Sequence, residues 1–250
     1  MKLHRVVFPS VVLAACLVAP GSDAHATLLV GNLAIAGSGS VAVTSNGVNY
    51  VIDFQPPVNT DGKGTGAVSI VGGSTGSFAG LTGTQATIKD LNDADVPVGV
   101  PVNLPDFLTF SAPSASQWTI TLTKLLTGSY GSADCLSAPA AGQNCTVGLP
   151  GVKEFNWSNI TDHSSIVSAS FEGIATDKAT GETSKINGTL GATFSDKPFQ
   201  TILSEAIGGA TITTSYSGTI TAVPEPATSS LMLLGGLVVA GAMVRRRMRS

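Results

Sequence analysis

The chain has 250 residues, of which 12% are charged and 43% are hydrophobic, and its formal net charge is −3. The central part, residues 27–222, holds 7 lysines, no arginine and 14 acidic residues, so its own net charge is near −7. This charge argues against nucleic acid and anionic lipid as partners, because both repel an acidic surface. Apolar residues recur throughout the segment, which distinguishes it from disordered chains and indicates one large or two small folded domains.

The first 26 residues have the features of a secretory signal peptide. Lys2 and Arg5 form a basic start, and residues 6–19 form an apolar stretch. Ala24 and Ala26 provide the small-x-small pattern at which signal peptidase cleaves. We therefore expect export of the chain and cleavage after Ala26.

The three cysteines allow two interpretations of the mature N-terminus. Leu13-Ala14-Ala15-Cys16 fits a lipobox, in which Cys16 would become a lipidated first residue. If cleavage follows Ala26 instead, Cys135 and Cys145 remain as an even pair in an exported chain, which predicts a disulfide. A loop of this length gives roughly 3 kcal/mol at most from chain entropy.

Alternation of apolar and polar residues predicts a body made of antiparallel strands. Residues 40–44 and 48–54 flank Asn46-Gly47, which is a strong hairpin signal. Further strands are predicted at 117–126, 165–175, 189–195 and 210–222, with a turn at Asn187-Gly188 and a candidate bulge at Gly218. We expect an all-β domain, either an antiparallel β-sandwich or a jelly roll.

One short helix is predicted near residues 198–207. Asp196 can cap its start, Pro198 suits a first-turn position, and Gly208-Gly209 ends it. The apolar residues of the segment share one stripe, which we expect to pack on the sheet: Phe199, Ile202, Leu203, Ala206 and Ile207.

The candidates for catalysis or metal binding are weak. His163 is the one histidine of residues 27–222, and it lies in Asp162-His163-Ser164-Ser165, where the neighbours are too close in sequence for a usual triad. We interpret it as a solvated loop histidine. An oxygen-rich cluster suits a hard cation such as Ca²⁺ but lacks the glycine and late glutamate of an EF-hand loop: Asp90, Asn92, Asp93 and Asp95. We predict no catalytic residue, no metal and no cofactor.

Two other functional classes remain open. A glycoside hydrolase would need a pair of carboxylates, and no pair stands out among the four glutamates of the body: Glu154, Glu172, Glu182 and Glu205. A carbohydrate-binding module would need exposed aromatic rings that stack on sugars. Trp118 falls on the apolar side of its strand, so Trp157 and Tyr130 are the candidate sugar contacts.

The C-terminal segment combines three features in a fixed order. Pro224-Glu225-Pro226 is extended and accessible, because two prolines exclude helix and sheet. Residues 227–244 carry no charge, and as a helix they would span roughly 27 Å, just short of the ~30 Å hydrocarbon core. The basic residues that follow stay on the cytoplasmic side and place the body on the far side of the inner membrane: Arg245, Arg246, Arg247 and Arg249.

This order of features resembles the PEP-CTERM sorting signal of Gram-negative bacteria that make exopolysaccharide. The resemblance implies that an exosortase, an integral-membrane processing enzyme, recognises Pro224-Glu225-Pro226. An ordinary single-span anchor is the alternative. The expected organisation is a signal peptide at 1–26, an extracytoplasmic β-domain at 27–222 and a sorting signal at 223–250.

The resemblance also implies a destination and a role. We expect a non-enzymatic protein that is held in the inner membrane in transit and then reaches the cell surface or the extracellular matrix. Its expected partners are signal peptidase, the exosortase and the membrane, with exopolysaccharide in a biofilm as a candidate ligand. A carbohydrate-binding module and a secreted hydrolase are the alternatives.

Overall fold

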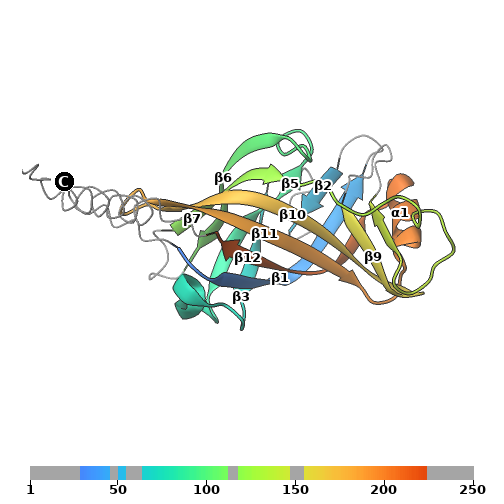
Figure 1. The fold of residues 1–250 in the computed structure, drawn as a ribbon, viewed down its shortest axis with the longest axis horizontal. Coiled ribbons are helices and arrows are strands. Elements are labelled where there is room, and N and C mark those ends of the chain that lie inside the picture. Colours follow the sequence, from blue (N-terminus) through green and yellow to red (C-terminus); the bar gives the residue numbers. More distant parts are fainter. Residues whose placement is uncertain (1–28, 46–49, 55–63, 112–117, 147–154, 224–250) are drawn as a thin grey trace, which may run out of the picture.

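The computed structural model describes residues 29–45, 50–54, 64–111, 118–146 and 155–223 (Figure 1). These residues form one antiparallel sheet system with two short helices. The elements are β1 (Asn32–Ser45), β2 (Tyr50–Asp53), β3 (Thr65–Ile70), the 3₁₀ helix η1 (Gly76–Leu81), β4 (Gln85–Lys89), β5 (Leu91–Asn92), β6 (Pro101–Phe110), β7 (Trp118–Leu125), β8 (Asn144–Thr146), β9 (Asn156–Thr161), β10 (Ser164–Asp177), β11 (Thr183–Phe194), α1 (Phe199–Ile207) and β12 (Ile212–Ala222).

Eight of the strands close on themselves. The hydrogen-bonded order runs β11-β12-β1-β3-β4-β6-β7-β10, and β10 pairs again with β11. A closed circuit leaves no free edge among its members, which removes the main route to edge-to-edge aggregation. Its interior is apolar and includes Phe107 and Phe171, whose rings meet edge to face with centroids 5.4 Å apart.

The four longest strands continue beyond the closed part into an open half. β10 pairs with β7 through residues 171–177 but with β9 through residues 164–168. β1 likewise pairs with β3 through residues 35–37 and with β2 through residues 42–45. The four long strands stay paired with one another there, while β10 and β1 change their outer neighbours. The helix α1 lies at this open end, where it contacts β1, β9, β10 and β12.

β11 shows how the residue pattern builds this sheet. Its buried residues alternate strictly with its outward-facing ones, as expected for a strand with one face on the core. Gly188 is buried opposite Phe171 in the register of β10, and a Cβ at this glycine would lie 2.2 Å from the Phe171 ring. The predicted turn at Asn187-Gly188 is therefore wrong, because the glycine sits inside a strand and makes room for an aromatic ring.

A bulge occurs in β1 rather than at Gly218. The register with β12 shifts between Ala36 and Ser40, at the point where β1 exchanges one partner for another. Gly37 lies in this bulge, where a Cβ would lie 2.2 Å from the Tyr216 ring. Gly218 keeps a regular register with β1 and β11, and its missing side chain allows close packing against Leu190. Bulges mark sites where a strand bends, and this one separates the closed half from the open half.

The helix α1 begins at the predicted place but is capped differently. Pro198 is the N-cap residue and provides no side-chain hydrogen bond, and the helix ends at Gly208 as predicted. The cap comes from β9, where Asn159 Oδ1 accepts the backbone N–H of Phe199 at 2.9 Å. On β10, the buried Ser165 hydroxyl donates to the carbonyl of Lys197 at 2.8 Å. Two strands thus hold the start of the helix, in place of the predicted cap at Asp196.

The two ends of the described domain meet at the closed half. The backbone N–H of Leu29 donates to the Ser184 hydroxyl, and that of Val223 donates to the carbonyl of Lys185. Both acceptors lie at the start of β11, which pairs there with the part of β10 that contacts β7. The chain therefore enters and leaves the domain at one place, far from α1.

The antiparallel all-β class with one short α-helix near residues 198–207 is confirmed. The predicted strands near 117–126, 165–175 and 210–222 correspond to β7, β10 and β12, and the antiparallel pairing of β1 with β2 confirms the first hairpin. Its Asn46-Gly47 turn lies outside the described residues. The sequence patterns did not indicate that eight strands close into a barrel.

Candidate functional site

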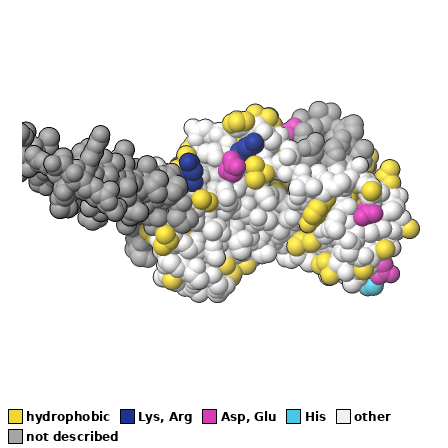
Figure 2. All heavy atoms as spheres, in the orientation of Figure 1, with side chains coloured by type: hydrophobic (Ala, Val, Ile, Leu, Met, Phe, Trp, Pro, Cys, Tyr) yellow, Lys and Arg dark blue, Asp and Glu magenta, His cyan; other side chains and the backbone are white. Residues whose placement is uncertain are grey.

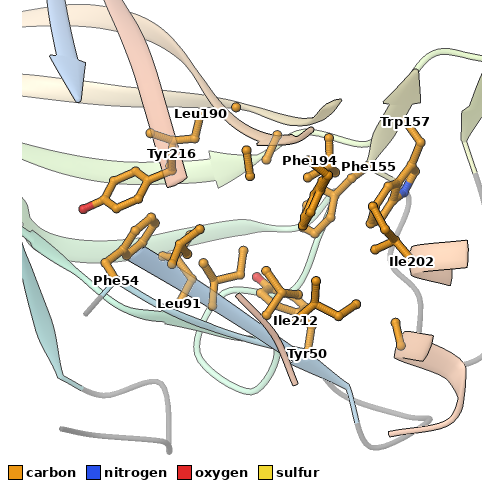
Figure 3. A pocket seen from close by; sticks show the side chains of 18 residues that line it. Tyr50, Phe54, Leu91, Phe155, Trp157, Leu190, Phe194, Ile202, Ile212 and Tyr216 are labelled. Carbon is orange, nitrogen blue, oxygen red and sulfur yellow. The ribbon is translucent and has the colours of Figure 1, made fainter. Parts of the chain in front are cut away.

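An apolar cavity occupies the open half of the domain. It has a volume of about 70 Å³ and is partly open. Its walls come from β1, β2, β5 and β9–β12 on one side and from α1 on the other. Figure 3 shows Phe54 and Tyr216 together at one end, and Trp157 beside Ile202 of α1 at the other.

Aromatic side chains give the cavity a rigid lining. Phe54 and Tyr216 are in contact with ring centroids 5.0 Å apart, and Tyr50 meets Phe155 edge to face at 5.8 Å. Such pairs contribute about 0.5–1.5 kcal/mol each beyond the area that they bury. These four residues are each at most 6% exposed. The lining is therefore part of the hydrophobic core and not a surface patch.

The hydroxyl groups in the lining are already engaged within the domain. Tyr50 Oη donates to the carbonyl of Val96, and Tyr216 Oη donates to the carbonyl of Ala67 at 3.3 Å. Burial, with a smaller effect of the nearby Asp93 carboxylate, raises the pKa of Tyr50 well above its usual value. Burial also raises the pKa of Tyr216. Both tyrosines therefore stay neutral at physiological pH and leave the cavity without charge.

A buried polar cluster fixes α1 against β9. Asn159 is 3% exposed, and its Nδ2 donates to Gln143 Oε1 at 3.1 Å and to Gln200 Oε1 at 2.9 Å. Gln200 Nε2 also donates to Gln143 Oε1 at 2.8 Å. Gln143 precedes β8, so one cluster connects the loop before β8, the strand β9 and the helix. The wall that α1 provides is thus held by side chains outside the cavity.

The predicted disulfide is present. Cys135 and Cys145 are bonded with their Cα atoms 5.1 Å apart, and both are buried. Cys145 lies on β8 directly opposite Trp157 on β9. The bond therefore fastens residue 135 to β8, the neighbour of the strand that carries the cavity-lining Trp157.

The two candidate sugar contacts do not form an exposed platform. Trp157 is 5% exposed and lines the cavity, so it is not the exposed ring that the candidate sugar contact requires. Its indole Nε1 is buried and meets no hydrogen-bond acceptor among the described residues. Tyr130 is exposed, and its backbone N–H donates to Thr146 Oγ1 on β8. Trp118 packs on the core as expected, edge to face with Phe78.

The ionisable candidates serve local structure. His163 is exposed in the turn between β9 and β10, where its Nδ1 lies 2.5 Å from Asp162 Oδ1. Glu205 on α1 forms an ion pair with Lys197 at 2.8 Å. Glu172 lies in the closed half, opposite Lys124 of β7. Glu182 precedes β11, and Glu154 lies outside the described residues. Among the described residues, no two glutamates therefore meet at the cavity.

The oxygen-rich segment after β4 forms a turn. Asn92 Oδ1 accepts the backbone N–H groups of Ala94 and Asp95, and Asn92 Nδ2 donates to Asp95 Oδ2 at 2.7 Å. Asp90 Oδ1 accepts the backbone N–H of Phe54 at 2.9 Å. These contacts are those of an asparagine-stabilised turn. In the described part of the chain, no group of three or more His, Cys, Asp or Glu residues could hold a metal ion.

The sequence patterns did not single out the cavity, although one signal was present. Phe155 and Trp157 are two residues apart in a segment that alternates with asparagine and serine. Residues two apart on a strand share a face. The pattern therefore indicated that Trp157 lies on the same buried face as Phe155.

Both terminal signals lie outside the described residues, including Ala24, Ala26, Pro224, Glu225, Pro226 and the arginines at 245–249. Among the described residues, no helix has the length and apolar character needed to span a membrane. The predicted signal peptide, cleavage site and span at 227–244 therefore stay predictions from the sequence.

Comparison with known proteins identifies the C-terminal segment. The family model of the PEP-CTERM protein-sorting motif matches residues 222–247, a range that includes Pro224-Glu225-Pro226 and the first three arginines of the basic cluster. No curated protein and no solved structure matches the chain. The chain thus carries a PEP-CTERM protein-sorting motif and is an exported protein that is sorted by an exosortase.

Proposed function

We propose that this protein is a non-enzymatic component of the cell surface or extracellular matrix, where its β-domain associates with exopolysaccharide in a biofilm. The observation that carries the proposal is the sorting motif at residues 222–247, which sends the chain through an exosortase. The predicted signal peptide and the disulfide between Cys135 and Cys145 support the same route, because disulfides persist in oxidising compartments outside the cytoplasm.

The outer surface of the sheet supports an association with neutral polysaccharide. Every second residue of β12 faces outward, and these residues are hydroxylated: Thr213, Ser215, Ser217, Thr219 and Thr221. A shallow depression of about 230 Å³ lies over β10, β11 and β12, and its rim includes Glu172, Asn187, Thr189 and Thr219. Hydroxyl and amide groups can exchange hydrogen bonds with sugar hydroxyls.

The charge of the domain favours a neutral or weakly charged polymer. Figure 2 shows that charged side chains are few and scattered over the face in view, and most of that face is uncharged. The net charge near −7 of residues 27–222 disfavours strongly anionic partners. Glu205 forms an ion pair with Lys197, and Glu172 lies in the other half of the domain. This separation of the two carboxylates also supports a binding role over glycoside hydrolysis.

Substitution of the motif tests the sorting route. In the native host, Pro224→Ala combined with Pro226→Ala should leave full-length protein in the inner membrane, while the parent chain is recovered from the surface or medium without its C-terminal tail. Pro97→Ala combined with Pro101→Ala removes two prolines from the β-domain and is the matched control. Intact mass of each fraction measures processing. Unchanged processing of the motif variant would refute recognition at Pro224-Glu225-Pro226.

Co-sedimentation with purified host exopolysaccharide tests the role at the surface. The parent chain should sediment with the polymer, and Thr189→Val combined with Thr219→Val should weaken the association, because valine keeps the shape of threonine but removes the hydroxyl. Thr213→Val, on the outer face of β12 but away from the depression, is the control. Failure of the parent chain to sediment would refute the association and leave the sorting result unaffected.

A further inference from the structure

We propose that the cavity between the open half of the sheet and α1 is a binding site for the apolar end of a small molecule, an alkyl chain in particular. The inference concerns a second site, inside the domain, and it does not depend on how the protein is sorted or on exopolysaccharide. It rests on the lining, the size and the rigidity of the cavity.

The lining selects against water and polar ligands. Aliphatic and aromatic side chains form nearly the whole wall, and the hydroxyls of Tyr50 and Tyr216 are already used by carbonyls of the domain. The indole Nε1 of Trp157 is the one polar side-chain group of the lining without an acceptor among the described residues, and it is a single donor. A water molecule needs two to four polar partners, and cavities of apolar lining stay dry and bind apolar guests. A hydrocarbon group would lose no hydrogen bond on entry and would contact aromatic faces.

The size determines how much of a ligand can enter. At about 70 Å³ the cavity is smaller than a simple apolar cavity of roughly 150 Å³ that accepts benzene or xenon. It cannot accept a peptide segment or a helix. Because it is partly open, the end of an alkyl chain can fill it while the polar part of the same molecule stays in the opening. This arrangement is typical of small-molecule sites, which are largely apolar with few polar groups.

The walls are held in place from outside, so the cavity does not close by collapse. Asn159 and Ser165 fix the start of α1, which carries Ile202 and Ala206 in the wall. On the opposite side, Trp157 lies on β9, which pairs with β8, and the disulfide through Cys145 holds β8. A space that is kept open by its surroundings is a preformed site, and preformed sites bind without a cost for reorganisation.

Trp157 provides a direct probe of occupancy. The chain has two tryptophans, and Trp118→Phe leaves Trp157 as the single reporter while it keeps an aromatic ring against Phe78. The full chain, held in lipid nanodiscs without detergent, is titrated with 1-bromobutane, a small alkyl compound whose bromine quenches indole fluorescence on contact. We expect saturable quenching of Trp157. In Trp157→Phe, where Trp118 is the reporter, quenching should rise linearly without saturation.

Filling the cavity distinguishes the site from general partitioning. Ala192→Leu places a larger side chain in the cavity, whereas Thr193→Leu adds similar bulk on the outward face of the same strand. In the Trp118→Phe background, Ala192→Leu should weaken the apparent affinity for 1-bromobutane by about tenfold or more, and Thr193→Leu should leave it within about twofold. Ala206→Leu fills the same space from α1 and serves if Ala192→Leu does not fold, as judged by circular dichroism.

Either of two results would overturn the proposed binding site. If 1-bromobutane quenches Trp157 without saturation, or if the filling variants bind it as the parent does, the cavity is only a packing defect of the core. Saturable binding that a folded filling variant weakens by about tenfold or more, with the outward control unchanged, would establish the site.

Discussion

Asn159 gives the sharpest test of how the wall of the cavity is held. Its buried side chain makes three hydrogen bonds, one to the first N–H of α1 and two to partly buried glutamine side chains. Loss of a helix cap costs about 1 kcal/mol, and each further buried hydrogen bond contributes about 1 kcal/mol. We therefore expect Asn159→Ala to lower the free energy of unfolding by about 3 kcal/mol.

The assay is thermal unfolding of the full chain in nanodiscs, followed by tryptophan fluorescence. For a domain of this size, about 3 kcal/mol corresponds to a decrease in Tm of about 6–12 °C. The matched control is Asn144→Ala on β8, whose exposed side chain accepts a hydrogen bond from Ser158 and donates one to the carbonyl of Gly142. Surface substitutions of this kind stay within about 0.5 kcal/mol, so Tm should change by no more than about 2 °C. Equal Tm changes in the two variants would refute the capping argument.

Three further predictions concern the sheet, the disulfide and the buried hydroxyls. Gly188→Ala should cost about 1–3 kcal/mol of stability because its Cβ would meet the Phe171 ring. Gly191→Ala is the control and should be nearly neutral, since a Cβ there has only ordinary contacts. Comparable Tm values for the two variants would contradict this packing. Cys145→Ser should lower the stability under oxidising conditions by roughly 3 kcal/mol and should abolish the effect of reductant on Tm. Because the pKa of Tyr50 is raised in the folded state, stability should fall as pH rises above about 10, and Tyr50→Phe should make this fall shallower in a pH series of unfolding curves.

The sequence predicted the parts of this fold that follow local rules. β7, β10 and β12 alternate apolar and polar residues over many positions, and α1 has an apolar stripe that ends at Gly208. The closure of the barrel could not be predicted in this way. It depends on which long strands pair with each other, and the period of two is satisfied by many pairings.

The wrong predictions of a turn at Asn187-Gly188 and of a helix cap at Asp196 have a common physical cause. The same residue types occur in local motifs and at positions that tertiary contacts determine. Asn187-Gly188 has the composition of a turn, but the glycine is needed because Phe171 occupies the space of its side chain. Asp196 is a residue type that commonly caps helices, but Asn159, distant in sequence, accepts the hydrogen bond from the first N–H of α1. Both depend on tertiary contacts, and local patterns do not contain that information.

The meeting of the chain ends at the start of β11 has a consequence for maturation. Among the described residues, the N–H of Leu29 and the N–H of Val223 both bind acceptors at the start of β11. The predicted cut after Ala26 and recognition at Pro224-Glu225-Pro226 both fall just beyond these two residues. Excision of both signals would therefore leave the strand pairings of the described domain in place, and both signals would depart from the same end of that domain.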